Sequence, residues 1–206
     1  VGYLTEAANT VGAQWVQAQP QKDGKNAGEM LTGAIKAAIL LNTEPAFDAA
    51  AGAKGLEQAD MVITLSPFKA NLDISDVLLP VAPFTETSGT FVNAEGRVQS
   101  FHAVVKPLGD TRPAWKVLRV LANLLELPGF DYESSQDVLT AAIGAETKEV
   151  PSALRSNITK VAAKVPENEA AEPVTASIYQ LDGIVRRATS LQLTADARLA
   201  REGGAA

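Results

Sequence analysis

The chain has 206 residues, of which 46% are hydrophobic, 20% are charged and none is cysteine. The lack of cysteine excludes disulfides, thiolate nucleophiles, cysteine zinc sites and cysteine-ligated iron–sulfur clusters from this chain. Its one histidine, His102, excludes a histidine cluster for a transition metal. The net charge of −6 argues against nucleic-acid binding, which needs concentrated positive charge. We therefore expect no metal site, and any redox chemistry must use groups from outside the chain.

The length suits one domain with an appendage, at about 100 to 200 residues per domain. We expect an α/β domain over residues 1–165, an acidic linker at 166–173 (PENEAAEP) and a C-terminal helical segment over 174–206. No run approaches the roughly 18 apolar residues of a membrane-spanning helix, and no secretion signal is evident. Because the chain begins at Val1 without methionine, we expect a fragment of a longer protein.

The first 81 residues predict a parallel α/β unit. Apolar residues at helical spacing predict a helix over 27–35, and the run at 37–41 shows no alternation, which suits a central strand covered on both faces. A helix over 47–58, weakened by glycine, precedes strands at 60–68 and 77–81. The carboxyl ends of parallel strands lie at one edge, where ligands usually bind. Those ends are residues 42–44, 66–68 and 81–84.

Residues 86–101 (ETSGTFVNAEGRVQSF) predict a loop and a hairpin, with Gly96 in the left-handed position of the turn. Extended chain should continue to Pro107. The following helix has Pro113 in its first turn and an apolar face that ends at Leu125, and Ser134 then caps another helix.

The C-terminal third contains two further predicted helices. A short one is expected over 151–161, and a longer one starts at Asp182, whose carboxylate should cap free backbone amides. Residues 201–206 should fray. The side chains expected to face inward from the longer helix are Ile184, Val185, Ala188 and Leu191.

Nucleotide-binding glycine motifs are missing, since no GxGxxG follows a strand and no GxxxxGK[ST] occurs. This makes an autonomous nucleotide-binding module the weakest interpretation. His102 has no carboxylate nearby in sequence, so we interpret it as a lone histidine held by a local hydrogen bond rather than a general base.

The loop before the hairpin is the chemical candidate that stays open. It could hold an anion or a polar cofactor. The residues available for that role are Ser88, the amide of Gly89, Asn93 and Arg97. In the structural alternative, Arg97 pairs with Glu86 or Glu95 and Asn93 ties the hairpin. Composition and spacing do not choose between these two interpretations.

Residues 60–101 (DMVITLSPFKANLDISDVLLPVAPFTETSGTFVNAEGRVQSF) resemble the C-terminal part of the large iron–sulfur subunit of NADH-quinone oxidoreductase, respiratory complex I, which is molybdopterin-oxidoreductase-like. Residues 26–48 and 178–197 agree with it. Gly183 stands where that family would have proline. The resemblance implies a Rossmann-like parallel sheet of the molybdopterin-oxidoreductase type with an added hairpin and C-terminal helices.

The same resemblance implies a scaffold role. The parent enzyme transfers electrons from NADH through iron–sulfur clusters to quinone and couples this to proton translocation. Its [2Fe-2S] and [4Fe-4S] clusters belong to a cysteine-rich N-terminal part, so no catalytic residue and no cofactor are expected here. Partners would be other peripheral-arm subunits, on the cytoplasmic side of the bacterial inner membrane or the matrix side in mitochondria, without membrane insertion.

A looser resemblance extends to molybdenum enzymes such as formate dehydrogenases. In those relatives this sheet and loop approach the pterin cofactor. The alternative hypothesis is therefore the cofactor-binding part of a molybdopterin-dependent oxidoreductase. Under that hypothesis Ser88, Gly89, Asn93 and Arg97 contact the pterin or its phosphates, whereas in the complex I subunit they are vestiges of a lost site.

Overall fold

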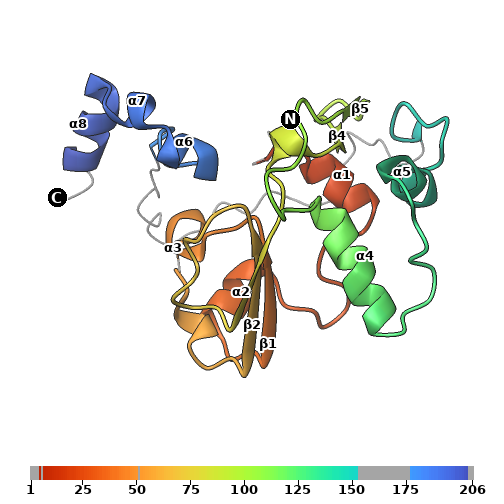
Figure 1. The fold of residues 1–206 in the computed structure, drawn as a ribbon, viewed down its shortest axis with the longest axis horizontal. Helices are drawn as coiled ribbons and strands as arrows, with labels where there is room; N and C mark the ends of the chain where they lie inside the picture. The colour runs from red at the N-terminus through yellow and green to blue at the C-terminus, as the bar shows by residue number, and fades with distance from the viewer. Residues whose placement is uncertain (1–4, 6, 51, 153–176, 204–206) are drawn as a thin grey trace, which may run out of the picture. The chain divides into compact units, whose positions relative to one another are not determined.

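The computed structural model describes residues 5, 7–50, 52–152 and 177–203. The chain divides into two compact units, which Figure 1 shows with their helices and strands. The first unit comprises residues 1–26, 65–67 and 79–163, and the second comprises residues 27–64, 68–78 and 164–206.

A three-stranded parallel sheet with the strand order β1-β2-β3 confirms the predicted α/β class. The elements around it, in chain order, are α2 (Ala27–Thr32), β1 (Ala37–Leu41), α3 (Pro45–Asp48), the 3-10 turn η1 (Lys54–Leu56), β2 (Met61–Ser66) and β3 (Val77–Pro80). The second unit has its core where Leu40, Leu56 and Val62 meet, with Leu31 and Ile35 packed against them. Apolar side chains from α2, β1, η1 and β2 thus pack against one another.

Strand β1 has the predicted bounds but not the predicted place. It lies at an edge of the sheet, with Ile39 51% exposed and only Leu40 of its residues buried. The expectation that both of its faces are covered is wrong. The middle strand is β2, where Val62, Thr64, Leu65 and Ser66 are buried. An apolar run therefore predicted a strand correctly, but not which strand would be central.

The helix expected over 47–58 is also wrong as a continuous element. It forms α3 and η1 instead, separated by backbone that includes Gly52 at φ +60°. Gly55 lies so close to α2 that a Cβ atom there would be 2.3 Å from the carbonyl oxygen of Leu31. The two glycines thus do more than weaken a helix, because one takes a left-handed conformation and the other allows close packing.

In the first unit, the predicted hairpin is confirmed. Strands β4 (Gly89–Val92) and β5 (Val98–Phe101) pair antiparallel, with Gly89 opposite Phe101 and Val92 opposite Val98. The turn places Gly96 at φ +84°. The side-chain oxygen of Asn93 accepts hydrogen bonds from the N–H groups of Glu95 (3.1 Å) and Arg97 (2.9 Å), which sets the shape of the turn.

The helices of this unit follow their sequence signals. Helix α4 (Ala114–Leu124) starts directly after Pro113, and α5 (Ser135–Ile143) carries a complete capping box between Ser134 and Asp137. Helix α1 (Thr10–Trp15) and the 3-10 turn η2 (Phe84–Glu86) were not predicted. Residues 102–108 form no strand.

The C-terminal segment forms α6 (Gly183–Arg187), α7 (Thr189–Gln192) and α8 (Ala195–Gly203) rather than one helix. Asp182 caps α6 as predicted, because its carboxylate accepts from the N–H groups of Ile184 (2.8 Å) and Val185 (3.2 Å). The predicted helix at 151–161 and the acidic linker lie outside the described residues.

The predicted inward face of the C-terminal segment is wrong for Ile184 and Leu191, whereas Val185 and Ala188 are half-buried. Ile184 is 36% exposed and Leu191 is 41% exposed, whereas the Arg186 side chain is only 6% exposed. Helix α6 is therefore oriented by the ion pairs of its arginines rather than by apolar burial. None of the helices formed by the described residues is long and apolar enough to cross a membrane.

Candidate functional sites

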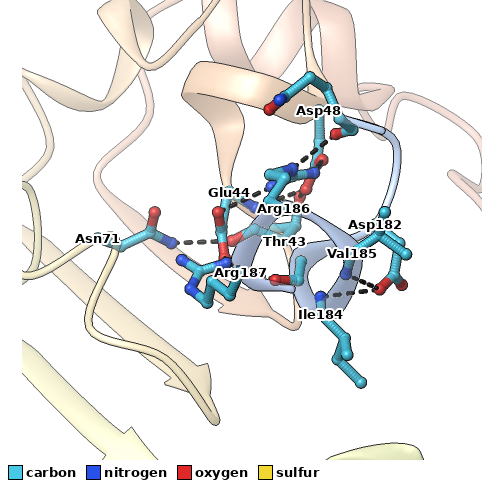
Figure 2. A network of polar contacts seen from close by, with 11 residues as sticks. Thr43, Glu44, Asp48, Asn71, Asp182, Ile184, Val185, Arg186 and Arg187 are labelled. Carbon is cyan, nitrogen blue, oxygen red and sulfur yellow. Dashed lines mark hydrogen bonds and ion pairs between the residues drawn. The ribbon is translucent and has the colours of Figure 1, made fainter. Parts of the chain in front are cut away.

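The carboxyl end of β1 carries a buried acidic group, Glu44, which is 5% exposed. Figure 2 shows two arginines of α6 converging on it. The Glu44 Oε2 atom lies 2.7 Å from Arg186 Nη1, and Oε1 lies 2.9 Å from Arg187 Nη1. Both carboxylate oxygens are therefore ion-paired, which is what a buried charge requires.

Arg186 is the more completely bound of the two arginines. Its Nη2 group donates to Asp48 of α3, and its Nε group donates to the carbonyl oxygen of Gln180 at 2.6 Å. Its guanidinium carbon lies 4.8 Å from the centre of the Phe47 ring. All three guanidinium nitrogens and one face of the group thus have partners.

Arg187 is held less tightly. Its side chain is 35% exposed, and its guanidinium carbon lies 4.0 Å from the centre of the Phe68 ring, just beyond β2. Gly183 fits this arrangement closely, since a Cβ atom there would be 3.2 Å from Phe68 and 3.3 Å from Glu44. We name this cluster of Glu44, Asp48, Phe47, Phe68 and the two arginines the arginine clasp.

The arginine clasp occupies the sheet edge where the sequence predicted a ligand. Residues 42–44 were one of the expected ligand-binding ends, and in this structure their neighbours are side chains of the chain's own C-terminal segment. The interaction between Glu44 and Arg186 spans 142 residues. The sequence did not predict this ion pair, because nothing in residues 185–187 indicates a partner so far away in the chain.

A second candidate site is a cavity of about 370 Å³ in the first unit. It lies among α1, β4, β5, α4 and α5, and Ser88 and Gly89 from the predicted loop both line it. Its walls also include both tryptophans of the chain, Trp15 and Trp115, and no Asp, Glu, Lys or Arg occurs among its described lining residues. The cavity therefore suits an uncharged group.

Two pairs of hydroxyl groups line this cavity. Ser88 Oγ lies 2.8 Å from Ser135 Oγ, and Thr90 Oγ1 lies 2.9 Å from Ser100 Oγ across the hairpin. In each pair one hydroxyl donates to the other, which leaves one O–H per pair able to donate to a bound molecule. These hydroxyls give a mainly apolar cavity a few directed polar groups, as is usual for ligand pockets.

An open hollow of about 570 Å³ adjoins the cavity and is basic. The two share Ser88, Trp115 and Ser135 in their walls. Three cationic and two acidic side chains line the hollow: Lys106, Arg112, Lys116, Glu86 and Glu133. Glu86 is engaged with the backbone, because it accepts from the N–H of Leu108 at 2.9 Å. The cationic side chains outnumber the acidic ones by one, which favours an anion in this hollow.

The four loop residues proposed from sequence therefore divide into two pairs. Ser88 and Gly89 line the cavity, whereas Asn93 and Arg97 do not. Asn93 ties the hairpin, as the structural alternative predicted. Arg97 is exposed, and its backbone bridges to that of Glu149.

His102 is exposed and lines the cavity. No carboxylate occurs among the described lining residues to orient it as a base, so the structure gives it no catalytic partner. In the parts of the chain that the structure describes, no three His, Cys, Asp or Glu side chains gather in a way that could hold a metal ion.

Several residues of these hollows were missed from the sequence. Trp115 was assigned only to the apolar face of its helix. Ser135 stands 47 residues from its partner Ser88, and no spacing rule connects them. The cations of the basic hollow lie within residues 106–116, but they form no basic run, so nothing in the sequence indicated that they share a site.

Comparison with known proteins identifies the family. The model of the molybdopterin oxidoreductase family matches residues 1–124. This chain belongs to the molybdopterin oxidoreductase family. The match covers the α/β sheet, the hairpin and α4, whereas the residues from 133 onward that line the two hollows lie beyond it.

Relatives in the molybdopterin oxidoreductase family include provisionally named formate dehydrogenases of Staphylococcus aureus. Those of strains USA300 and NCTC 8325 are 38% identical over 77 residues, which is 37% of this chain. That of strain MRSA252 is 33% identical over 84 residues, which is 40% of this chain. In each case the aligned part covers only 8% of the relative's length.

The donor groups of the two hollows fit a cofactor of the molybdopterin kind. A pterin is flat and carries hydrogen-bonding edges, and its tail is a phosphate. The uncharged cavity offers indole rings and spare hydroxyls, and the adjoining hollow offers lysine and arginine. An apolar cavity joined to a basic hollow matches these two parts in chemistry.

Proposed function

We propose that this chain is part of the cofactor-binding portion of a molybdopterin-dependent oxidoreductase of the formate dehydrogenase type. The observation that supports this most is the uncharged cavity that shares Ser88, Trp115 and Ser135 with a basic hollow. The family match and the formate dehydrogenase-like relatives support the same proposal.

In this proposal the chain's residues bind and orient, and they carry out no chemical step. Ser88 and Ser100 orient the ring, while Lys106 and Lys116 neutralise the phosphate. The bound group supplies the redox chemistry, which a chain without cysteine does not provide. Trp15 and Phe101 keep water away from the ring.

The test is retention of pterin by the chain produced in cells that make the cofactor. Purified wild-type protein should release a fluorescent pterin on denaturation. Lys116→Gln should lower the retained amount about tenfold, because a charged hydrogen bond contributes roughly 1.5 kcal/mol or more. Lys148→Gln, which changes an exposed lysine outside both hollows, should retain pterin as the wild type does. Wild-type protein without pterin would refute the proposal.

A second candidate, a scaffold in the peripheral arm of NADH-quinone oxidoreductase, is favoured by a different observation. The two outer passages that resemble the large subunit of complex I, residues 26–48 and 178–197, meet in the arginine clasp. Under this proposal the clusters lie in other parts of the subunit, no pterin is bound, and other peripheral-arm subunits are the partners. Co-purification with NADH-oxidising activity, without pterin, would favour it over the cofactor-binding proposal.

A further inference from the structure

The arginine clasp has the chemistry of a binding site rather than of a surface ion pair. We propose that the carboxyl end of β1 is a guanidinium-binding site and that the chain fills this site with Arg186 of its own C-terminal segment. This inference does not depend on the proposed function, because the arginine clasp lies in the second unit and shares no residue with the cavity or the basic hollow.

The acidic side of the site is positioned by its own backbone. Asp48 Oδ2 accepts from the N–H of Glu44 at 2.7 Å and from the hydroxyl of Thr43 at 3.3 Å. The carbonyl oxygen of Thr43 accepts from the side chain of Asn71 at 2.8 Å, and Asn71 is 4% exposed. Figure 2 shows this chain of contacts. The Asp48 carboxylate and the backbone of Thr43 and Glu44 are therefore held in place by hydrogen bonds that do not involve α6.

The geometry selects a guanidinium over an ammonium. The two Nη groups of Arg186 donate to two carboxylates at the end of β1, Glu44 and Asp48, while its Nε group donates to the carbonyl oxygen of Gln180 on its own segment. The flat group also lies over the Phe47 ring at 4.8 Å. A lysine ammonium is a single point of charge without a flat face, so it does not bridge two separated carboxylates and stack on a ring in the way that a guanidinium does.

The ligand class follows from this geometry. A small molecule that carries a guanidinium group, or an arginine on another peptide, fits the site once Arg186 leaves it. Glu44 is buried, so an empty site would contain a poorly compensated charge. The C-terminal segment thus acts as an internal ligand, and its release requires a substitute cation of the same shape.

The experiment uses the full chain and follows hydrogen exchange of the amides of residues 184–192. Arg186→Ala should raise their exchange about a hundredfold, because removing one partner of a buried ion pair is strongly destabilising. Arg198→Ala, on exposed α8 of the same segment, should leave exchange unchanged. Amides of the β4–β5 hairpin in the first unit report whether the variant is folded.

Chemical rescue then identifies the ligand. Millimolar methylguanidinium should slow the exchange of Arg186→Ala toward the wild-type rate, and methylammonium at the same concentration should not. The double variant Glu44→Gln/Arg186→Ala should lose the rescue. Unchanged exchange in Arg186→Ala, equal rescue by methylammonium, or rescue that persists in the double variant would each overturn the proposal.

Discussion

Gly89 offers the sharpest test of the cavity, because the structure leaves no space for a side chain there. A Cβ atom on Gly89 would lie 2.5 Å from Cζ and 2.8 Å from Cε1 of Phe101, its partner across the hairpin. Ordinary contacts of this kind begin at 3.4 Å, so Gly89→Ala must move the ring by about 0.9 Å, the difference between 3.4 and 2.5 Å. Phe101 also contacts Phe91 edge to face at 5.5 Å, so the ring is not free to move without loss.

Gly89→Ala should lower the free energy of unfolding by the amount typical of an overpacked core, about 1–3 kcal/mol. For a protein of this size this lowers the melting temperature by roughly 2–4 °C per kcal/mol. The assay is calorimetry of the wild type and Gly89→Ala, with intrinsic fluorescence as a second probe. Trp15 and Trp115 are the chain's two tryptophans and both line the cavity, so the emission reports on this unit alone.

The double variant Gly89→Ala/Phe101→Leu supplies the control. Leucine lacks the ring atoms that the new Cβ would meet. Alanine at position 89 should therefore lower the free energy of unfolding much less in the Phe101→Leu background than in the wild type. A coupling between the two changes is then expected. If Gly89→Ala is neutral, or if its cost is the same in both backgrounds, the close approach to Phe101 is not the reason for glycine.

Three further outcomes follow from the first unit. Leu65 is 1% exposed, so Leu65→Ala should lower the free energy of unfolding, measured in urea, by about 2–5 kcal/mol. Leu124 is 77% exposed, so Leu124→Ala should change this free energy by less than about 0.5 kcal/mol. Equal effects of the two substitutions would contradict the burial of Leu65. Ser134→Ala should lower the free energy of unfolding by about 1 kcal/mol, because it removes the capping box of α5. Thr140→Ala, at an exposed position of the same helix, serves as the control. The backbone N–H of Ser134, then its hydroxyl and the N–H of Glu133, hold the pKa of Asp137 below its usual value of 3.8. A lowered pKa in the folded state means that the stabilisation is present above the unfolded-state pKa and is lost as the pH falls through the folded-state pKa. The melting temperature of Asp137→Asn should therefore fall less on acidification than that of the wild type, and identical acid profiles would show that the cap does not respond to the charge.

The sequence alone predicted those elements whose signals are local. The hairpin followed from a glycine in the turn, and Gly96 has the expected positive φ of 84°. Ser134 and Asp182 cap α5 and α6 as predicted, because a cap needs only residues two or three positions apart. The apolar runs predicted β1 and β2 and with them the α/β class, since the period and length of such runs reflect backbone geometry.

The candidate sites were predicted only in part, for a physical reason. Ser88 and Gly89 were found because they lie in a loop with polar turn chemistry. Their cavity depends on contacts across 47 residues, as between Ser88 and Ser135. Spacing rules describe neighbours on one element, and they contain nothing about which helix will pack against a hairpin.

The tertiary structure also decided the orientation of the C-terminal segment. Apolar spacing predicted that Ile184 and Leu191 would face inward, yet both are exposed and Arg186 is buried. The Glu44 carboxylate lies 142 residues before Arg186 in the chain. Leaving this buried carboxylate without a cationic partner would cost more than exposing Ile184 and Leu191. Local signals in the sequence therefore predicted the helix caps, the hairpin and the strands, and folding decided which charges meet, because the cost of an unpaired buried charge exists only once the chain has closed around it.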